Sequence, residues 1–281
     1  MKKWMQSKLP KIVGFGINTI GLIAPSYAAK KALDIFCTPR GGKIKHYHKS
    51  FLDTIPQRKL NIDELDIQTY YIDKKASKTV LLVHGWESNM ARWKRLIKHL
   101  KDENINIVGL DGPAHGASGS DKFNGLLYAK MINTVVEEYQ PQIIIGHSIG
   151  AFSCAAFMHI YGQKSIKDFI ILASPNSMTD ITNKYFEIIG LSQKVANRYY
   201  DCFTKWFAHP IPYYATSNFL ANSAVKGILI HDEGDEINPY FNATQIMQQW
   251  KNADLITTQG LGHSLQSKDV FNKIKSYIKS I

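Results

Sequence analysis

Short apolar runs alternate with longer amphipathic segments along most of the chain. The runs are rich in Ile, Val and Leu, which is typical of strands buried on both faces of a sheet. We expect strands at 44–52, 67–72, 79–83, 105–110, 142–145, 169–173, 227–230 and 254–258. Helices are expected at 90–100, at 125–139, from the segment after Ser148 to about Tyr161, and at 265–281. This alternation predicts the α/β class, with a mostly parallel central sheet and helices on both of its faces.

The interval 175–224 interrupts the alternation. It lies between two predicted strands, is rich in Tyr, Phe and Trp, and has a mostly helical pattern. An insertion of this kind is a candidate lid over a site at the sheet edge. Ordinary helical packing against the core is the other interpretation, and the two do not exclude each other.

Residues 1–43 form a separate basic and apolar segment. The stretch from Ile12 to Ala29 carries no charge and has lysines on both sides. It matches a secretory signal cleaved after Ala28, a marginal membrane span, or one or two short helices broken at Pro25. Such helices would lie on a bilayer or on the protein itself. The three alternatives stay open, as does a peripheral membrane contact through residues 1–40.

The net positive charge is concentrated in the N-terminal segment. Of the formal net charge of +11, most comes from residues 1–49, which hold ten basic residues and one acidic residue. The rest of the chain is nearly neutral. A basic excess confined to one apolar terminus fits an anionic membrane surface better than nucleic acid, so no nucleic-acid partner is expected.

Cysteine usage and motif content exclude several other classes. Cys37, Cys154 and Cys202 are widely spaced, which argues against a disulfide framework and a zinc site and favours a reducing, cytoplasmic compartment. No phosphate-binding loop, dinucleotide motif or metal-ligand spacing occurs, so no cofactor or metal is expected. The alternation 46–48 (His-Tyr-His) is taken as incidental to a strand.

The segment Gly146-His147-Ser148-Ile149-Gly150 matches G-x-S-x-G. It follows a run of isoleucines and precedes a helix start rich in small residues. That strand–turn–helix context is the nucleophile elbow, in which the serine hydroxyl is exposed and the glycines allow a sharp turn. Ser148 is therefore the candidate nucleophile.

From residue 44 to 281 the chain resembles the α/β-hydrolase superfamily, and in particular its serine esterases. His84-Gly85-Trp86 resembles that superfamily's first oxyanion-hole loop. The resemblance implies an oxyanion hole made by the backbone N–H groups of Trp86 and Ile149. The run 111–119 resembles that superfamily's turn D-x-P-G-H-G-x-S, but it has Ala114 where glycine is usual. The resemblance assigns His115 and Ser118 to the framework. His84 and His147 lie in tight turns and are taken as structural.

The resemblance also implies the other two members of a catalytic triad. The loop 231–239 resembles the superfamily's acid turn and sets Asp235 at the acid position, with Asp232 as its main competitor. His263, in a Gly-His turn after the last strand, is the expected general base. The order Ser148, Asp235, His263 is the one that this fold uses.

These residues predict a serine hydrolase that cleaves carboxylic esters of a small acyl substrate through an acyl-enzyme. The aromatic insertion and basic terminus suggest lipid-like acyl groups. The same triad serves thioester, amide and carbon–carbon bond hydrolysis, which remain alternatives. A non-catalytic, membrane-peripheral protein that keeps the fold is the third. The oligomeric state is not predicted.

Overall fold

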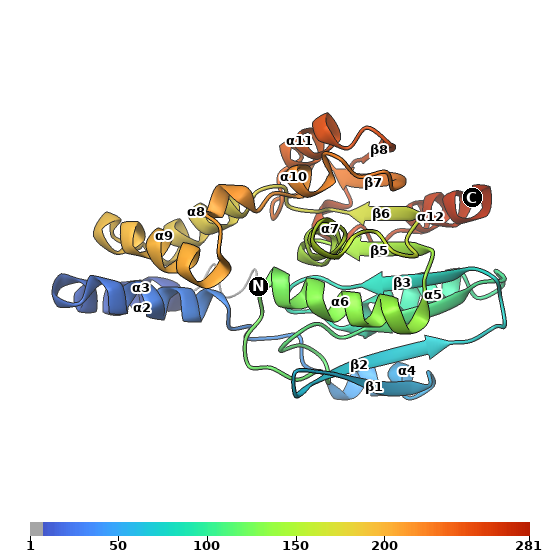
Figure 1. The fold of residues 1–281 in the computed structure, drawn as a ribbon, viewed down its shortest axis with the longest axis horizontal. Helices are drawn as coiled ribbons and strands as arrows, with labels where there is room; N and C mark the ends of the chain where they lie inside the picture. Colours follow the sequence, from blue (N-terminus) through green and yellow to red (C-terminus); the bar gives the residue numbers. More distant parts are fainter. Residues whose placement is uncertain (1–7) are drawn as a thin grey trace.

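One eight-stranded sheet forms the centre of residues 8–281, the part of the chain that the computed structural model describes (Figure 1). Its strand order is β1-β2-β4-β3-β5-β6-β7-β8. β3 to β8 are mutually parallel, whereas β2 runs antiparallel to β4, and β1 to β2. The strands are β1 (Gln57–Ile62), β2 (Leu65–Ile72), β3 (Thr79–Val83), β4 (Asn106–Leu110), β5 (Ile143–His147), β6 (Asp168–Leu172), β7 (Lys226–Asp232) and β8 (Ala253–Thr258). The predicted mostly parallel sheet is confirmed.

Helices cover both faces of this sheet. The α-helices are α2 (Leu9–Ile23), α3 (Pro25–Phe36), α4 (His46–Leu52), α5 (Lys94–His99), α6 (Gly125–Tyr139), α7 (Ile149–Tyr161), α8 (Met178–Ile189), α9 (Gln193–Phe207), α10 (Thr216–Leu220), α11 (Phe241–Gln249) and α12 (Lys268–Ser280). Short 3₁₀ turns are η1 (Met90–Trp93), η2 (Ile211–Tyr213) and η3 (Gly262–Ser264). α6 has the predicted bounds, and α7 ends at the predicted Tyr161.

The core is divided into two layers by the sheet, because successive strand side chains point to opposite faces. On β5, Ile144 joins the cluster that contains α6, α7 and α11. Ile143 and Ile145 join the other cluster, with α5 and α12. All five residues of β5 are buried, as in a parallel sheet covered on both faces.

The carboxyl ends of the parallel strands meet at one edge, where the chain leaves β3 and β5 in opposite directions across the sheet. β3 lies between β4 and β5, so the strand order reverses there. Ligand sites of open α/β sheets form at such reversal points. Ser148 directly follows β5 at this edge.

Two helical hairpins lie side by side beyond that edge (Figure 1). We call α2 with α3 the N-terminal hairpin, and α8 with α9, within the predicted interval 175–224, the inserted hairpin. The chain turns between α2 and α3 at Ala24, directly before Pro25. Proline at the first helical position needs no N–H partner, so it begins α3 and ends α2, as the two-helix alternative predicts.

The two hairpins are joined by close backbone contact and hydrogen bonds. A Cβ on Gly14 would lie 1.7 Å from the carbonyl oxygen of Ile189, so glycine is required for this approach. The Asn18 amide donates to Gly190 O at 2.8 Å and accepts from the backbone N–H of Ser192 at 2.9 Å. The N-terminal hairpin is thereby part of the folded unit. Lys2 and Lys3, to which the signal alternative assigns its basic start, lie outside the described residues.

The predicted strand 44–52 is wrong. His46–Leu52 is helix α4, whose first turn is held by the backbone N–H of Lys45 donating to His48 Nδ1 at 3.2 Å. The edge of the sheet is formed by β1, which pairs with β2 across a tight turn at Asp63 and Glu64. Both turn residues have positive φ, as a two-residue hairpin requires. β1 is polar and exposed, so hydrophobic periodicity gives no signal for it.

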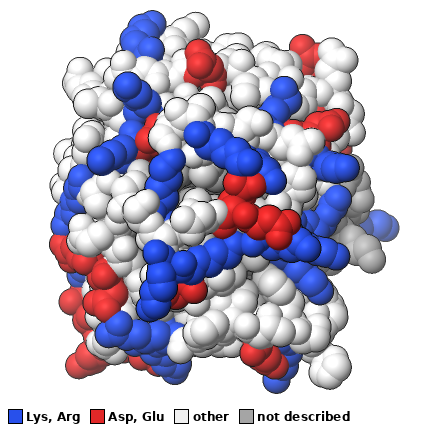
Figure 2. All heavy atoms as spheres, turned by 90° about the vertical axis from the view of Figure 1, so that its right-hand side faces the viewer, with Lys and Arg blue, Asp and Glu red and all other residues white. Residues whose placement is uncertain are grey.

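The end of the molecule opposite the hairpins is polar and mixed in charge. Figure 2 shows Lys and Arg interspersed with Asp and Glu on this face, where α12 ends. Lys275 and Lys279 of α12 both pair with Glu103 there. Among residues 8–281, no helix has the length and apolarity needed to cross a bilayer.

Candidate active site

Ser148 occupies a strained turn between β5 and α7. Its φ of +56° and ψ of −131° are unusual for a residue with a side chain. A Cβ on Gly146 would lie 2.5 Å from Ala151 Cα, and one on Gly150 would lie 2.2 Å from His84 O. The glycines of G-x-S-x-G are therefore needed for close packing around the turn. The turn places Ser148 at the sheet edge, where it is 8% exposed and lines a cavity.

Ser148, His263 and Asp235 are brought together in one hydrogen-bonded chain. The distance from Ser148 Oγ to His263 Nε2 is 3.1 Å, and that from His263 Nδ1 to Asp235 Oδ2 is 2.8 Å. Because the carboxylate accepts from Nδ1–H, the other ring nitrogen is free to accept the serine proton. The three residues come from loops after β5, β7 and β8 at the same edge.

The environment of Asp235 keeps it ionised. Burial alone would raise the pKa of this carboxyl, but hydrogen bonds from His231 and His263 and from the backbone N–H of Asn238 lower it well below its ordinary value. Oδ1 accepts the N–H groups of Ile237 and Asn238, each at 2.9 Å. Oδ2 is thereby aimed at His263.

Asp232, the competing acid, has a different set of partners. Its Oδ2 accepts the backbone N–H of Leu261 at 2.9 Å and the hydroxyl of Thr258 at 2.8 Å. Its Oδ1 accepts the N–H of Gly234. No contact to His263 accompanies these bonds within the described residues. Asp232 instead ties the loop that carries Asp235 to the loop that carries His263.

The histidines assigned to the framework are buried and fully engaged. His84 accepts the N–H of Gly112 at 2.9 Å, and His115 accepts the N–H of Glu87 at 2.8 Å. Burial lowers the pKa of both imidazoles to about 4, so they are neutral at pH 7. Both hold loops that surround the nucleophile turn.

His147 has a contact with the base that its place in a tight turn does not predict. Its Nε2 lies 2.9 Å from the carbonyl oxygen of His263, and the two rings are 4.8 Å apart. Burial lowers the pKa of His147, which keeps the ring neutral. The motif that reveals Ser148 thus also contains a residue that fixes the backbone of the base.

The two residues that the resemblance assigns to an oxyanion hole, Trp86 and Ile149, lie beside the cavity of Ser148. Trp86, Ile149 and Ser148 line the same cavity. Ile149 is the first residue of α7, so its N–H has no partner within the helix and carries part of the positive end of the helix dipole. In the described part of the chain, neither this N–H nor that of Trp86 donates to another group.

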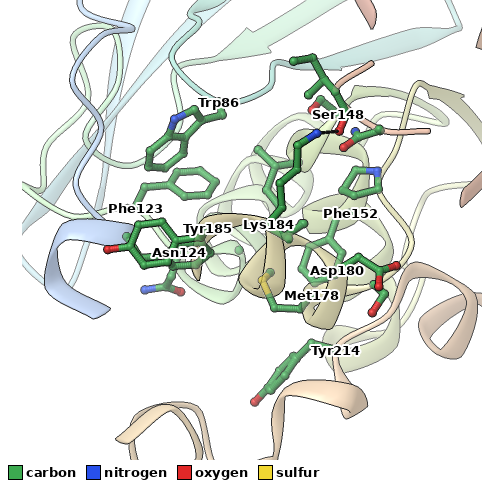
Figure 3. A pocket seen from close by; sticks show the side chains of 18 of the residues that line it. Trp86, Phe123, Asn124, Ser148, Phe152, Met178, Asp180, Lys184, Tyr185 and Tyr214 are labelled. Atoms are coloured by element: carbon green, nitrogen blue, oxygen red, sulfur yellow. Dashed lines mark hydrogen bonds between the residues drawn. The ribbon is translucent and has the colours of Figure 1, made fainter. Parts of the chain in front are cut away.

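A largely apolar cavity of about 330 Å³ opens beside Ser148 (Figure 3). It is enclosed by side chains from α3, the start of α6, α7 and the inserted hairpin. The larger apolar ones are Phe36, Trp86, Phe123, Phe152, Met178, Tyr185, Phe203 and Tyr214. Its size is within the range of small-molecule sites. The hydrogen-bonded chain of Ser148, His263 and Asp235 therefore lies beside an apolar cavity.

Lys184 is a polar residue of this cavity that the sequence does not reveal. Its Nζ donates to the carbonyl oxygens of Glu236 and Ile237, each at 3.0 Å. In Figure 3 the side chain reaches from α8 toward the loop after Asp235. A single lysine in a helical pattern does not indicate that its side chain lines a cavity. α3 likewise lines the cavity, through Ile35 and Phe36, although sequence reasoning assigns no site residue before Trp86.

Known proteins match this architecture. Residues 78–212 match the family described as the alpha/beta hydrolase fold. Est1E of Butyrivibrio proteoclasticus, solved with ferulic acid bound, is 16% identical with a TM-score of 0.64, covering 79% of this chain and 98% of its own. The chain has the α/β-hydrolase fold. The resemblance found in the sequence is thereby confirmed.

Further proteins that this chain matches differ in their described activities. The thioesterase domain of the curacin biosynthetic pathway is 18% identical with a TM-score of 0.59, covering 80% of this chain and 99% of that domain. A Mycoplasma genitalium relative named as an esterase/lipase is 25% identical over 46% of this chain and 47% of its own length. The karrikin insensitive 2 receptor CA of Petunia hybrida is 27% identical over 37% of this chain and 41% of its own. The chain thus spans less than half the length of these two relatives.

Proposed function

We propose that this α/β-hydrolase is a serine hydrolase that cleaves carboxylic esters through an acyl-enzyme on Ser148. The observation that carries the proposal is the continuous hydrogen-bonded chain from Asp235 through His263 to Ser148. A serine hydroxyl becomes a nucleophile when a positioned base removes its proton during attack. The Mycoplasma genitalium relative, which is named as an esterase/lipase, supports the same reaction class.

In the acylation step, Ser148 Oγ attacks the ester carbonyl carbon while its proton passes to His263 Nε2. The carbonyl oxygen becomes an oxyanion and accepts the N–H groups of Trp86 and Ile149. Each such donor lowers the barrier by about 3 kcal/mol. Asp235 stabilises the imidazolium that forms. When the C–O bond to the alcohol breaks, His263 returns the proton to the leaving oxygen.

Deacylation repeats these roles with water as the nucleophile. His263 takes one proton from the water as its oxygen attacks the acyl carbon, and the same two amides hold the second oxyanion. Breaking the bond to Ser148 Oγ releases a carboxylic acid, and the proton on His263 returns to the serine. The enzyme is restored with no cofactor consumed.

The cavity supports an apolar acyl group. Its walls are mostly aromatic and aliphatic, and the charged exceptions are Arg40, Glu87, Asp180 and Lys184. Burying one CH₂ group contributes about 0.8 kcal/mol, which corresponds to roughly a fourfold change in rate or affinity. We therefore expect kcat/KM to rise as the acyl chain is lengthened from acetyl to butanoyl and hexanoyl.

A panel of p-nitrophenyl esters of increasing acyl length tests the proposal. The wild-type chain should hydrolyse them, and Ser148→Ala should reduce the rate to that of the buffer. Ser165→Ala is the matched control, because its hydroxyl only donates to the backbone of Pro141, far from the cavity. Absence of turnover on every ester, combined with turnover of the matching thioesters, would shift the assignment to thioester hydrolysis.

A further inference from the structure

The outer surface of α2 is apolar and exposed. The large exposed apolar residues there are Leu9, Ile12, Phe15, Ile20, Leu22 and Ile23, and we call this set the outer face of α2. Phe15 is 75% exposed and Ile23 is 93% exposed. Contiguous exposed apolar side chains of this size mark an interaction surface in a folded protein.

The orientation of α2 is fixed, so this exposure is not relieved by rotating the helix. Its opposite face, with Pro10, Gly14, Ile17 and Gly21, is buried. A Cβ on Gly21 would lie 2.3 Å from Val195 of the inserted hairpin, which leaves no space for a larger side chain. α2 is therefore apolar on both sides, and a helix of this kind is covered either by protein or by lipid.

The length of α2 determines how lipid would cover it. Its 15 residues span about 22 Å at 1.5 Å per residue, against about 30 Å for the hydrocarbon core of a bilayer. A helix of this length cannot cross a bilayer. One face is also held against the inserted hairpin, which leaves the outer face to lie in the plane of the interface.

The charges around the outer face indicate which partner binds there. Lys8 precedes Ile12 by one helical turn, and Lys30 and Lys31 are exposed on α3. The acidic residue of this hairpin, Asp34, is half-buried and pairs with Lys122 at 3.4 Å. A second copy docked through the same face would bring lysines against lysines. Anionic lipid headgroups complement them.

We propose that the outer face of α2 docks this protein on an anionic bilayer, with α2 parallel to the membrane surface. The docking does not depend on the proposed esterase activity. It does concern the same structural unit, because α3 of the docked hairpin ends at Ile35 and Phe36, which line the cavity of Ser148. Docking would therefore place the cavity close to the bilayer that contains lipid acyl groups.

Flotation of the full chain with vesicles tests the proposal. Wild type should bind vesicles of phosphatidylcholine containing about 30% phosphatidylglycerol, and bind vesicles of phosphatidylcholine alone much more weakly. The double variant Phe15→Ser, Ile23→Ser should lose roughly tenfold or more of the partition coefficient. The double variant Lys30→Glu, Lys31→Glu should lose the preference for anionic lipid. All these side chains point outward, so the melting temperature should stay unchanged.

Matched controls separate this face from general stickiness. Tyr47 is 65% exposed on α4 and Ile160 is 48% exposed on α7, both outside the two hairpins. Tyr47→Ser, Ile160→Ser should bind vesicles as wild type does. Equal binding by the Phe15→Ser, Ile23→Ser protein would overturn the proposal. The proposal would also be overturned if the wild type did not bind vesicles but formed a dimer that the Phe15→Ser, Ile23→Ser protein did not form. The outer face would then bind a second copy of the chain.

Discussion

The imidazole of His147 donates from Nε2 to the carbonyl oxygen of His263 at 2.9 Å. The residue that precedes the candidate nucleophile thus holds the backbone of the candidate base. Sequence reasoning assigns His147 a structural role in a tight turn, and the contact gives that role a specific target. His147 is a positioning residue, since it acts on Ser148 through His263.

Replacing His147 by Phe should therefore lower kcat about tenfold with little change in KM. The ring volume is kept, while the donor to His263 O is lost, at a cost of about 1–2 kcal/mol. His147→Gln should recover much of the rate, because its amide can donate in the same direction. Steady-state kinetics on a p-nitrophenyl ester measures both. A Phe variant with unchanged kcat would remove His147 from the account.

The roles of the two acids should separate by mutation. Asp235→Asn should reduce kcat by about 10⁴-fold, because His263 would lose the partner that sets its tautomer. Asp232→Asn should chiefly lower the free energy of unfolding, by about 1.5–3 kcal/mol, since its carboxylate accepts hydrogen bonds from Leu261 and Thr258. Kinetics and urea unfolding of both variants provide the comparison. The reverse pattern would make Asp232 the catalytic acid.

Buried neutral histidines predict loss of stability on the acid side. His84 and His115 have folded-state pKa values of about 4, against 6.5 in the unfolded chain. Between these values the unfolded chain takes up protons that the folded chain cannot. The free energy of unfolding therefore falls as pH drops from 6.5 toward 4, by about 2 kcal/mol per group at pH 5.

Urea unfolding at pH 7 and pH 5 measures this effect. In His115→Gln, the decrease in unfolding free energy between the two pH values should be smaller than in wild type by about 2 kcal/mol. His46→Gln is the control, because His46 is exposed and its replacement should leave the decrease unchanged. An equal decrease in His115→Gln and wild type would contradict the assignment of His115 as a buried neutral residue.

The contact between the hairpins should respond to two neighbouring glycines in opposite ways. Gly14→Ala would place a methyl group 1.7 Å from Ile189 O and should destabilise the protein by about 1–3 kcal/mol. A Cβ on Gly16 meets nothing within 4 Å, so Gly16→Ala should stabilise α2 by about 1 kcal/mol through helix propensity. Thermal unfolding distinguishes them. Equal effects would mean that α2 does not pack on the inserted hairpin as described.

Local pattern predicts much of the fold. The buried strands are uniform apolar runs, and the helices at 125–139 and 149–161 have clear caps or motifs at their starts. The convergence of Ser148, Asp235 and His263 follows from loops at the carboxyl ends of parallel strands. The hydrogen-bond geometry agrees with that prediction, while the catalytic roles await the kinetics above.

The features that escaped prediction depend on distant parts of the chain. β1 is polar, and only its pairing with β2 makes it a strand. The packing of α2 against the inserted hairpin joins residues more than 170 positions apart, as in the bond from Asn18 to Gly190. No local sequence pattern connects Lys184 with the loop of Asp235, to which it donates a hydrogen bond. Such contacts follow from tertiary structure rather than from local sequence.

The most direct measurement is the mass of the intact protein after reaction with a fluorophosphonate, followed by peptide mapping. An activated serine forms a stable phosphonyl adduct, whereas an ordinary serine does not react. We predict one adduct, on Ser148, which is lost in Ser148→Ala and strongly slowed in His263→Ala. An unmodified wild type, or an adduct on another residue, would contradict the account.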